Sequence, residues 1–285
     1  MQVHRIALAL ACALHASTLT AQAPWWADSL EYARSEVVPI RVASDGFPYV
    51  SVRIDTTDLW LLFDTGNMVG LTVESRWFDE LALPVVETIR RRDSAGELIG
   101  AFRVGRASTV EALARTEREV SVREFRHPRL AGLFGPDDLP GSRFTLDYRH
   151  RVLAVAASPV PHVFGRAAHR LIRSARHPRL IVVEGTFRGT PILIEIDTGK
   201  SRTVVDPAWA AGAGLAVDGT DTVAVGAVRV GDAVFDVRDA KPVSLGGIDP
   251  ELPAPLVMSL GSDTLARFVL TVDYTRGLVL LWHAR

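Results

Sequence analysis

The sequence predicts an all-β protein of two pseudo-symmetric, closed β-barrel-like lobes with a cleft between them. Three observations indicate this fold class. Short apolar segments alternate with turns, and the 22 Gly and 16 Pro are dispersed along the chain, as in proteins with many short strands. An apolar strand that ends in Asp-Thr-Gly occurs twice, at 64–66 and 197–199. The segments downstream of both triplets also match, which identifies an internal repeat.

Size and charge narrow the class of protein. A chain of 285 residues can hold one large domain or two lobes of about 100–150 residues each. A hydrophobic content of 48% provides for a sizeable core. The formal net charge of -1 creates no overall positive field, so the composition argues against a nucleic-acid partner.

Residues 1–23 are predicted to be a signal peptide. A basic residue precedes the short apolar run 6–14, and small residues at Ala21 and Ala23 offer two cleavage sites. We therefore expect an exported protein, periplasmic or secreted; the alternative is a disordered or buried N-terminal helix. The run is too short to span a bilayer and no other stretch is long enough, so no stable membrane span is expected. The mature chain would also lack a thiol nucleophile, because Cys12 is the one cysteine.

The N-terminal lobe is expected over residues 37–158, after a short helix at 25–34. Alternating apolar residues over 40–54 predict a half-buried strand. After a turn at 56–58, the apolar run 59–63 predicts a buried return strand. The hairpin therefore ends at the first Asp-Thr-Gly.

The C-terminal lobe, over residues 179–285, repeats this pattern. The segment 183–196 matches 50–63 at one constant offset, and the lobe endings 133–148 and 259–274 match at a second offset. Two repeats are too few for a solenoid, so we expect them to pair as a pseudo-dimer.

Residues 159–178 are expected to link the two lobes. Arginines recur in this segment with few apolar residues between them, which favours a solvated linker helix. Contact with an anionic membrane or an acidic partner is the alternative interpretation.

The two triplets place one carboxylate each at the mouth of a buried strand. Burying a carboxylate is costly unless it is paired or hydrogen-bonded, so matching contexts for Asp64 and Asp197 suggest that the two meet. Two close carboxylates cannot both ionise cheaply, and they titrate as a unit with one proton between them. The ionised member can take a proton from water while the protonated member donates to a scissile carbonyl.

The other residues of the triplets have predicted supporting roles. Thr65 and Thr198 can lock the two loops by hydrogen bonds. Gly66 and Gly199 let backbone N–H groups approach the carboxylates, which a Cβ would hinder. This chemistry requires no metal and no cofactor, and the eight histidines show no metal-ligand spacing.

On these motifs the chain resembles the pepsin/retropepsin aspartic peptidases, most closely the compact, two-lobed, single-chain retropepsin-like proteins of bacteria. The matched features are the two triplets and the apolar-Gly segments at 133–135 and 259–261, although Ser259 stands where an apolar residue is usual. The resemblance covers roughly residues 40–282. It implies the acid-protease fold, a catalytic dyad of Asp64 and Asp197, a peptide or protein substrate, and a monomer.

Two residues that follow the triplets depart from the family pattern. Asn67 and Lys200 stand where Ser, Thr or Ala is usual. Asn67 is expected to be harmless. An ammonium aimed at the dyad would favour two ionised carboxylates, whereas one that extends to solvent would have no effect. We expect Lys200 to point outward.

The tyrosine of the pepsin-type flap is also missing, since no Tyr occurs between Asp64 and Tyr148. A hairpin tip is the expected substitute. Its predicted substrate-binding residues are Arg92, Asp93, Ser94, Ala95 and Gly96.

These features predict an exported aspartic endopeptidase, a hydrolase. Lys200 and the missing tyrosine motivate an alternative, a catalytically silent binding or assembly module. A third hypothesis is a precursor that processes only its own N-terminal segment. Asp137 and Asp263, which follow the structural glycines, are expected to be turn or cap residues rather than a second acid pair.

Overall fold

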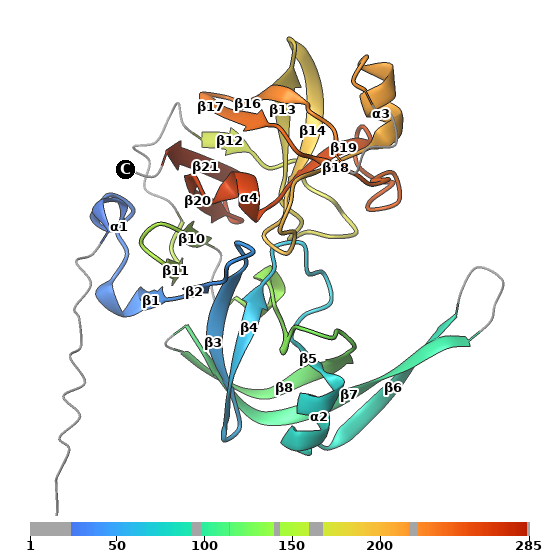
Figure 1. Cartoon of the computed structure of the whole chain (residues 1–285). Helices are drawn as coiled ribbons and strands as arrows, with labels where there is room; N and C mark the ends of the chain where they lie inside the picture. Colours follow the sequence, from blue (N-terminus) through green and yellow to red (C-terminus); the bar gives the residue numbers. More distant parts are fainter. Residues whose placement is uncertain are drawn as a thin grey trace, which may run out of the picture.

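The computed structural model describes residues 24–92, 98–113, 115–139, 143–159, 168–216 and 222–283. The predicted signal peptide lies outside these residues. The described chain is largely β and contains one closed six-stranded barrel, one curled half-barrel, and a six-stranded sheet to which both halves of the chain contribute (Figure 1). The prediction of a mostly-β fold is confirmed.

The first lobe forms the closed barrel. The predicted hairpin is present, and Val50, Val52 and Ile54 on its first strand are buried, as the alternation indicated. The barrel runs β3-β4-β9-β5-β8-β7 and closes because β7 pairs back onto β3. The elements of this lobe are β2 (Arg41–Val42), β3 (Pro48–Ile54), β4 (Thr57–Phe63), β5 (Thr72–Glu74), α2 (Ser75–Leu81), β6 (Val85–Arg92), β7 (Leu98–Ala112), β8 (Arg115–Phe125), β9 (Gly132–Phe134) and the 3-10 turn η2 (Pro136–Asp138).

The second lobe repeats the order of elements but stays open. Its sheet runs β17-β16-β13-β14-β19-β15-β18. In the first lobe one long strand, β8, pairs with both β7 and β5, whereas here its counterpart is divided into β17 and β18, which do not pair with each other. The expectation of a closed second lobe is therefore corrected to a half-barrel. Its elements are β13 (Val182–Phe187), β14 (Thr190–Ile196), β15 (Val204–Val205), α3 (Pro207–Gly212), β16 (Gly226–Val230), β17 (Ala233–Val237), β18 (Lys241–Pro242), β19 (Leu256–Leu260) and α4 (Ser262–Leu265).

A shared sheet joins the two halves of the chain. Its order is β1-β11-β10-β20-β21-β12. Thr145 pairs with Thr271 at its centre, and their hydroxyls lie 2.7 Å apart. These threonines occupy the same place in the two repeats, so the pseudo-two-fold axis passes between them. The strands are β1 (Val37–Pro39), β10 (Arg143–Asp147), β11 (Val152–Ala156), β12 (Ala168–Arg170), β20 (Phe268–Asp273) and β21 (Leu278–His283).

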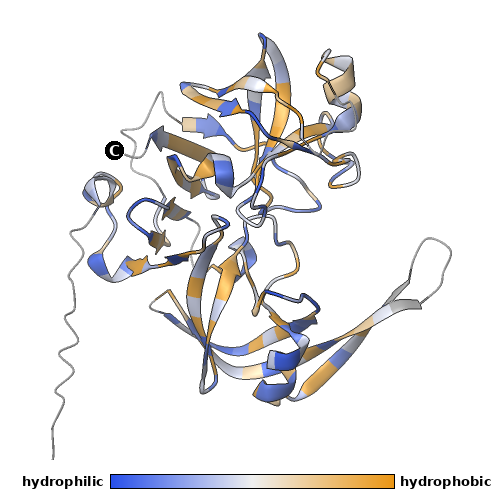
Figure 2. Cartoon of the chain, in the orientation of Figure 1, coloured by the Kyte–Doolittle hydropathy of each residue, from blue (hydrophilic) through white to orange (hydrophobic). Residues whose placement is uncertain are grey.

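The central strands of this shared sheet are buried on both faces. Figure 2 shows hydrophobic residues along β10, β11, β20 and β21, and every residue of β11 and β20 is buried. The N-terminal helix α1 (Trp25–Ser29) packs against it, with Trp26 fully buried and its indole N–H donating to Asp147 at 2.7 Å. This helix is shorter than predicted and is followed by the 3-10 turn η1 (Arg34–Glu36).

The described part of the predicted linker is not a helix. Residues 168–170 form β12, which pairs with β21, and residues 172–178 have no helical segment. Backbone hydrogen bonds to the shared sheet therefore replace those that a helix would make. Residues 160–167 lie outside the described part of the chain.

Candidate active site

Asp64 and Asp197 follow directly after β4 and β14, and the neighbouring strands fix their backbones. β4 pairs in parallel with β9, and β14 with β19. The Asp64 N–H donates to the carbonyl of Phe134 at 2.9 Å, and the Asp197 N–H donates to that of Leu260 at 3.0 Å. The predicted apolar-Gly segments thus hold both carboxylate-bearing turns in the same way.

Four reciprocal hydrogen bonds through Thr65 and Thr198 lock the two turns together. The Thr65 hydroxyl donates to the Ile196 carbonyl at 2.9 Å and accepts from the Thr198 N–H at 2.9 Å. The Thr198 hydroxyl donates to the Phe63 carbonyl at 2.5 Å and accepts from the Thr65 N–H at 3.0 Å. Both side chains are buried, so no water competes for these bonds.

The two glycines bring the carboxyl groups against each other. Each glycine N–H donates to the carboxylate of its own turn, Gly66 to Asp64 at 2.9 Å and Gly199 to Asp197 at 2.8 Å. A Cβ on Gly66 would lie only 2.7 Å from the Asp197 carboxyl carbon, and one on Gly199 would overlap the Asp64 carboxyl. Because each glycine faces the opposite carboxyl, neither position accepts a side chain.

The pairing changes the proton affinity of the site. Burial, the charge of Asp197 and a hydrogen bond with it raise the pKa of Asp64 from 3.8 to about 8. The Gly66 N–H and the Lys200 ammonium oppose this rise but do not cancel it. Asp64 therefore favours the protonated form more strongly than an isolated aspartate does.

Lys200 does not point outward, so that expectation is wrong. Its ammonium contacts the Asp197 carboxylate and donates to Glu195 at 3.2 Å. Burial disfavours the charged ammonium, but the two carboxylates outweigh burial and raise the pKa of Lys200. The attraction of two buried acids explains the inward orientation, because an ammonium in solvent would leave both without a counter-charge.

Glu195 is a site residue that the sequence analysis did not identify. It lies on β14 two residues before Asp197 and is 2% exposed. Burial and the charge of Asp197 raise the pKa of Glu195, and Lys200 opposes this rise. An acid inside the apolar strand 192–196, where the first lobe has Leu62, was the available signal.

Further polar contacts support the turns from behind. Tyr148 of the first lobe shares a 3.0 Å hydrogen bond with Ser262, whose hydroxyl donates to the Thr198 carbonyl at 3.1 Å. Asp263 accepts from the N–H and hydroxyl of Thr203, both at 2.9 Å. Asp263 is thus a turn residue, as expected, while in the first lobe Asp138 accepts the Gly135 N–H at 2.8 Å and Asp137 is exposed.

The predicted flap is only partly described. β6 and β7 form a long hairpin that extends away from the barrel (Figure 1). Arg92 ends β6, but Asp93, Ser94, Ala95 and Gly96 lie outside the described residues. Substrate binding by this tip remains a prediction.

A pocket of about 470 Å³ lies where the hairpin meets β5, β8 and β9. Apolar residues dominate its lining, among them Val69, Phe102 and Leu133, with Arg90 and Arg123 alongside. Leu133 pairs with Leu62 next to the end of β4. Neither Asp64 nor Asp197 is among its lining residues, although Leu62 precedes Asp64 by two positions.

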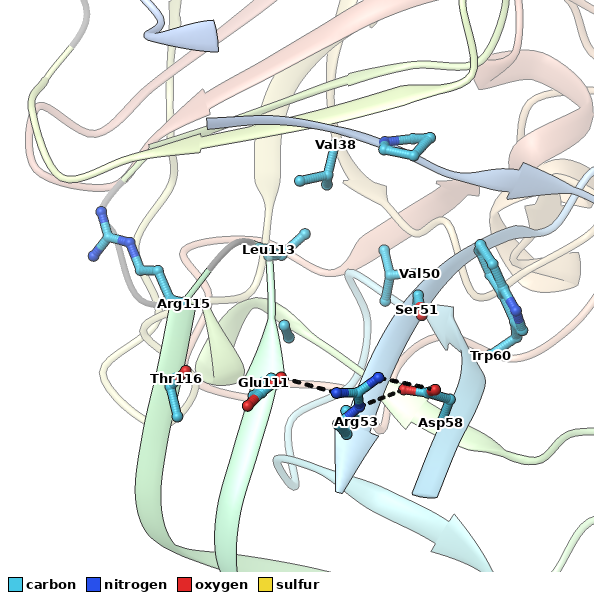
Figure 3. Close-up of a pocket in the computed structure, with 12 residues that line it drawn as sticks. Val38, Val50, Ser51, Arg53, Asp58, Trp60, Glu111, Leu113, Arg115 and Thr116 are labelled. Atoms are coloured by element: carbon cyan, nitrogen blue, oxygen red, sulfur yellow. Dashed lines mark hydrogen bonds and ion pairs between the residues drawn. The ribbon is translucent and has the colours of Figure 1, made fainter. Parts of the chain in front are cut away.

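A larger pocket, of about 600 Å³, is not lined by either Asp64 or Asp197. It is lined by residues of β1, β3, β4 and the β7–β8 connection (Figure 3). Arg53 occupies it with ion pairs to Asp58 at 2.8 Å and Glu111 at 3.7 Å. These are partly exposed side chains that satisfy one another.

Comparisons with known proteins do not identify a family. No protein-family model matches the chain, and a search of curated proteins gives no significant match.

No helix in the described part of the chain is long and apolar enough to cross a membrane. Among the described residues, no three His, Cys, Asp or Glu side chains gather as a metal site.

Proposed function

We propose that the protein is an aspartic endopeptidase in which Asp64 and Asp197 together activate water for peptide hydrolysis. The observation that carries this proposal is the contact of one carboxyl from each repeat, in turns fixed by the reciprocal threonine bonds. A structural role for the two acids would not need matched glycines that face the opposite carboxyls.

The two carboxyls have different tasks in the proposed reaction. A water between them loses a proton to ionised Asp197 while its oxygen bonds to the scissile carbonyl carbon. Asp64 donates its proton to the carbonyl oxygen, so no oxyanion is left unpaired. As the C–N bond of the tetrahedral diol breaks, Asp197 gives the proton it took from water to the amine nitrogen. Asp64 takes back a proton from a diol hydroxyl as the C=O bond of the new carboxyl group forms. No covalent enzyme intermediate is formed.

The pocket beside the β6–β7 hairpin supports a peptide substrate. Its lining of Val69, Phe102 and Leu133 suits an apolar side chain. Val69 is 47% exposed although apolar, and it lies five positions after Asp64. We therefore propose cleavage next to an apolar residue. With residues 1–23 as a signal peptide, the protein would act outside the cytoplasm.

Replacement of one carboxyl tests the proposal. Asp64→Asn keeps the shape of the side chain but removes the acid, so cleavage of a peptide library by the purified protein should fall at least 100-fold. Asp137→Asn, at an exposed carboxyl on the same lobe, should leave cleavage unchanged. Undiminished cleavage by Asp64→Asn would end the assignment.

A second candidate is the catalytically silent binding module. The contact between Lys200 and Asp197 favours it, because a fixed ammonium stabilises the carboxylate form and can remove the shared proton. Pepstatin-sensitive cleavage by the wild-type protein at any pH would exclude a silent module.

A further inference from the structure

The two repeats differ in polarity at three positions around their Asp-Thr-Gly turns, and at two of these they differ in charge. In the first lobe these positions are neutral, and in the second they hold an acid, a base and a hydroxyl. Leu62, Asn67 and Leu133 correspond to Glu195, Lys200 and Ser259. The differences are not scattered, since Glu195 pairs with Ser259 in the β14–β19 ladder and Lys200 contacts Glu195.

In the neutral set of the first lobe, the polar side chain of Asn67 forms its hydrogen bonds within its own loop. The Asn67 side chain donates to the Gly70 carbonyl at 2.9 Å and accepts from the Val69 N–H at 3.1 Å. It is buried within its own loop and places no charge beside Asp64.

The charged set of the second lobe is directed at Asp197. Lys200 bridges Asp197 and Glu195, and the side chains of both acids are less than 10% exposed. The hydroxyl of Ser259 is close enough to lower the pKa of Glu195, although it completes no well-aligned hydrogen bond within the described residues. Burying three charges costs several kcal/mol that an apolar set would not, so stability alone does not explain this arrangement.

We propose, on the basis of the peptidase function above, that Lys200 is a positioning residue that assigns the proton roles of the dyad. Its ammonium, held in place by Glu195, keeps Asp197 ionised as the base and leaves the proton on Asp64 as the acid. Two like carboxyls thereby become unequal, and the productive state is populated near neutral pH rather than only in strong acid.

In the described part of the chain, the titratable groups that face Asp197 come from several elements, and Lys200 opposes the two acids among them. Asp64 faces it from the end of β4, Glu195 from β14, and Lys200 from the following turn. Tyr148, after β10, is also near, but burial raises the pKa of its phenol and keeps it neutral. The group in direct contact with Asp197 that carries a positive charge is Lys200.

The pH profile of kcat/KM for peptide cleavage tests the assignment. Lys200→Met removes the charge but keeps the length of the side chain, so the acid limb of the profile should move up by about 1–3 pH units. Lys200→Arg should restore most of the wild-type limb. Lys241→Met, at the exposed second lysine of the chain, should leave the profile unchanged.

A double variant guards against loss of folding in Lys200→Met. Glu195→Leu/Lys200→Met removes both charges and should move the acid limb in the same direction by a smaller amount, since the acid that opposed Lys200 is also gone. An acid limb that stays in place in both variants overturns the assignment, even where kcat falls. The assignment is also overturned if the wild-type protein is inactive and a Lys200 variant is active.

Carboxyl titration gives a readout that does not depend on activity. In protein labelled with ¹³C at aspartate carboxyls, Asp64→Asn and Asp197→Asn assign the two resonances. We expect one of the pair to stay ionised from pH 5 to 7 in wild type and to titrate about 1–3 units higher in Lys200→Met. If the two resonances titrate at the same pH in wild type and in Lys200→Met, the assignment is overturned. Absence of cleavage at every pH, with the expected titration intact, counts against the peptidase function and leaves the charge assignment standing.

Discussion

The two strand ends that carry Asp64 and Asp197 share one backbone design but have opposite surroundings. Both turns have the same threonine lock, the same glycine contact and the same parallel strand beneath. In the first lobe the carboxyl has neutral neighbours, and in the second it has Lys200 and Glu195. The comparison shows that the repeated backbone gives the two acids the same local geometry, while the charged neighbours differ between the lobes.

The lobes also differ in what lies beside their turns. The first lobe has the long β6–β7 hairpin and a pocket of about 470 Å³ at its base. In the described part of the second lobe the corresponding hairpin, β16–β17, has strands of five residues each. If the site binds a peptide, the first lobe offers the larger contact surface and the second lobe supplies the charge.

Breaking the charged set of the second lobe should produce the largest change in stability. Lys200→Asn, measured at pH 8, leaves Glu195 and Asp197 buried without their counter-charge and should lower the free energy of unfolding by about 3–5 kcal/mol. Glu195→Leu/Lys200→Asn copies the first lobe and should recover most of this loss. Urea denaturation measures both. A double variant as unstable as the single one would contradict this explanation.

Removing either threonine of the reciprocal hydrogen bonds should lower the free energy of unfolding by the same amount. Thr198→Val leaves the Phe63 carbonyl and the Thr65 N–H without their partner, for an expected loss of about 2–4 kcal/mol. Thr65→Val should match it within about 1 kcal/mol, because its two lost bonds are equivalent. The exposed Thr56→Val serves as a control. Clearly unequal losses in denaturant unfolding would show that the lock is not symmetric.

Removing the acid of the first lobe should change how stability depends on pH. Asp64 has a pKa of about 8 in the folded chain against an ordinary 3.8, so between these values only the folded state keeps the proton. Its contribution to stability therefore declines as pH rises from about 4 to 8. Asp64→Asn removes this decline and should be more stable than wild type at pH 8 by at least about 1.4 kcal/mol.

Thermal unfolding of wild type and Asp64→Asn from pH 4 to 9 measures that difference. Asp58→Asn is the matched control, since Asp58 is exposed and its Arg53 hydrogen bond lowers rather than raises its pKa. Parallel pH profiles for wild type and Asp64→Asn would contradict the elevated pKa.

The smallest effect is expected at the partly exposed ion pair in the larger pocket. Arg53 and Asp58 are 2.8 Å apart, but their side chains are 48% and 60% exposed. Solvent screens such a pair, so Arg53→Ala should leave the midpoint of thermal unfolding unchanged within error. A clear shift of the unfolding midpoint would mean that solvent exposure does not explain why this ion pair contributes less to stability than that of Lys200 and Glu195.

Much of the fold and of the candidate site could be predicted from local pattern. The alternation in 40–54 predicted β3, and the matched segments predicted the two hairpins and the pseudo-dimer. Asp64 and Asp197 were expected to meet because burial of an isolated carboxylate is costly. Local pattern could not predict which lobe closes into a barrel. Closure depends on whether one strand pairs with two distant neighbours, as β8 does and as β17 and β18 do not.

The sequence by itself determined the repeat, the two carboxyls and the threonines and glycines that join them, since all of these lie in short matched motifs. The tertiary structure decided the orientation of Lys200, the role of Glu195 and the open form of the second lobe. A side chain between solvent and a buried acid is oriented by the balance of desolvation and charge. That balance depends on which groups from β14, β19 and the opposite lobe surround it, and their distances are set only when the chain is folded.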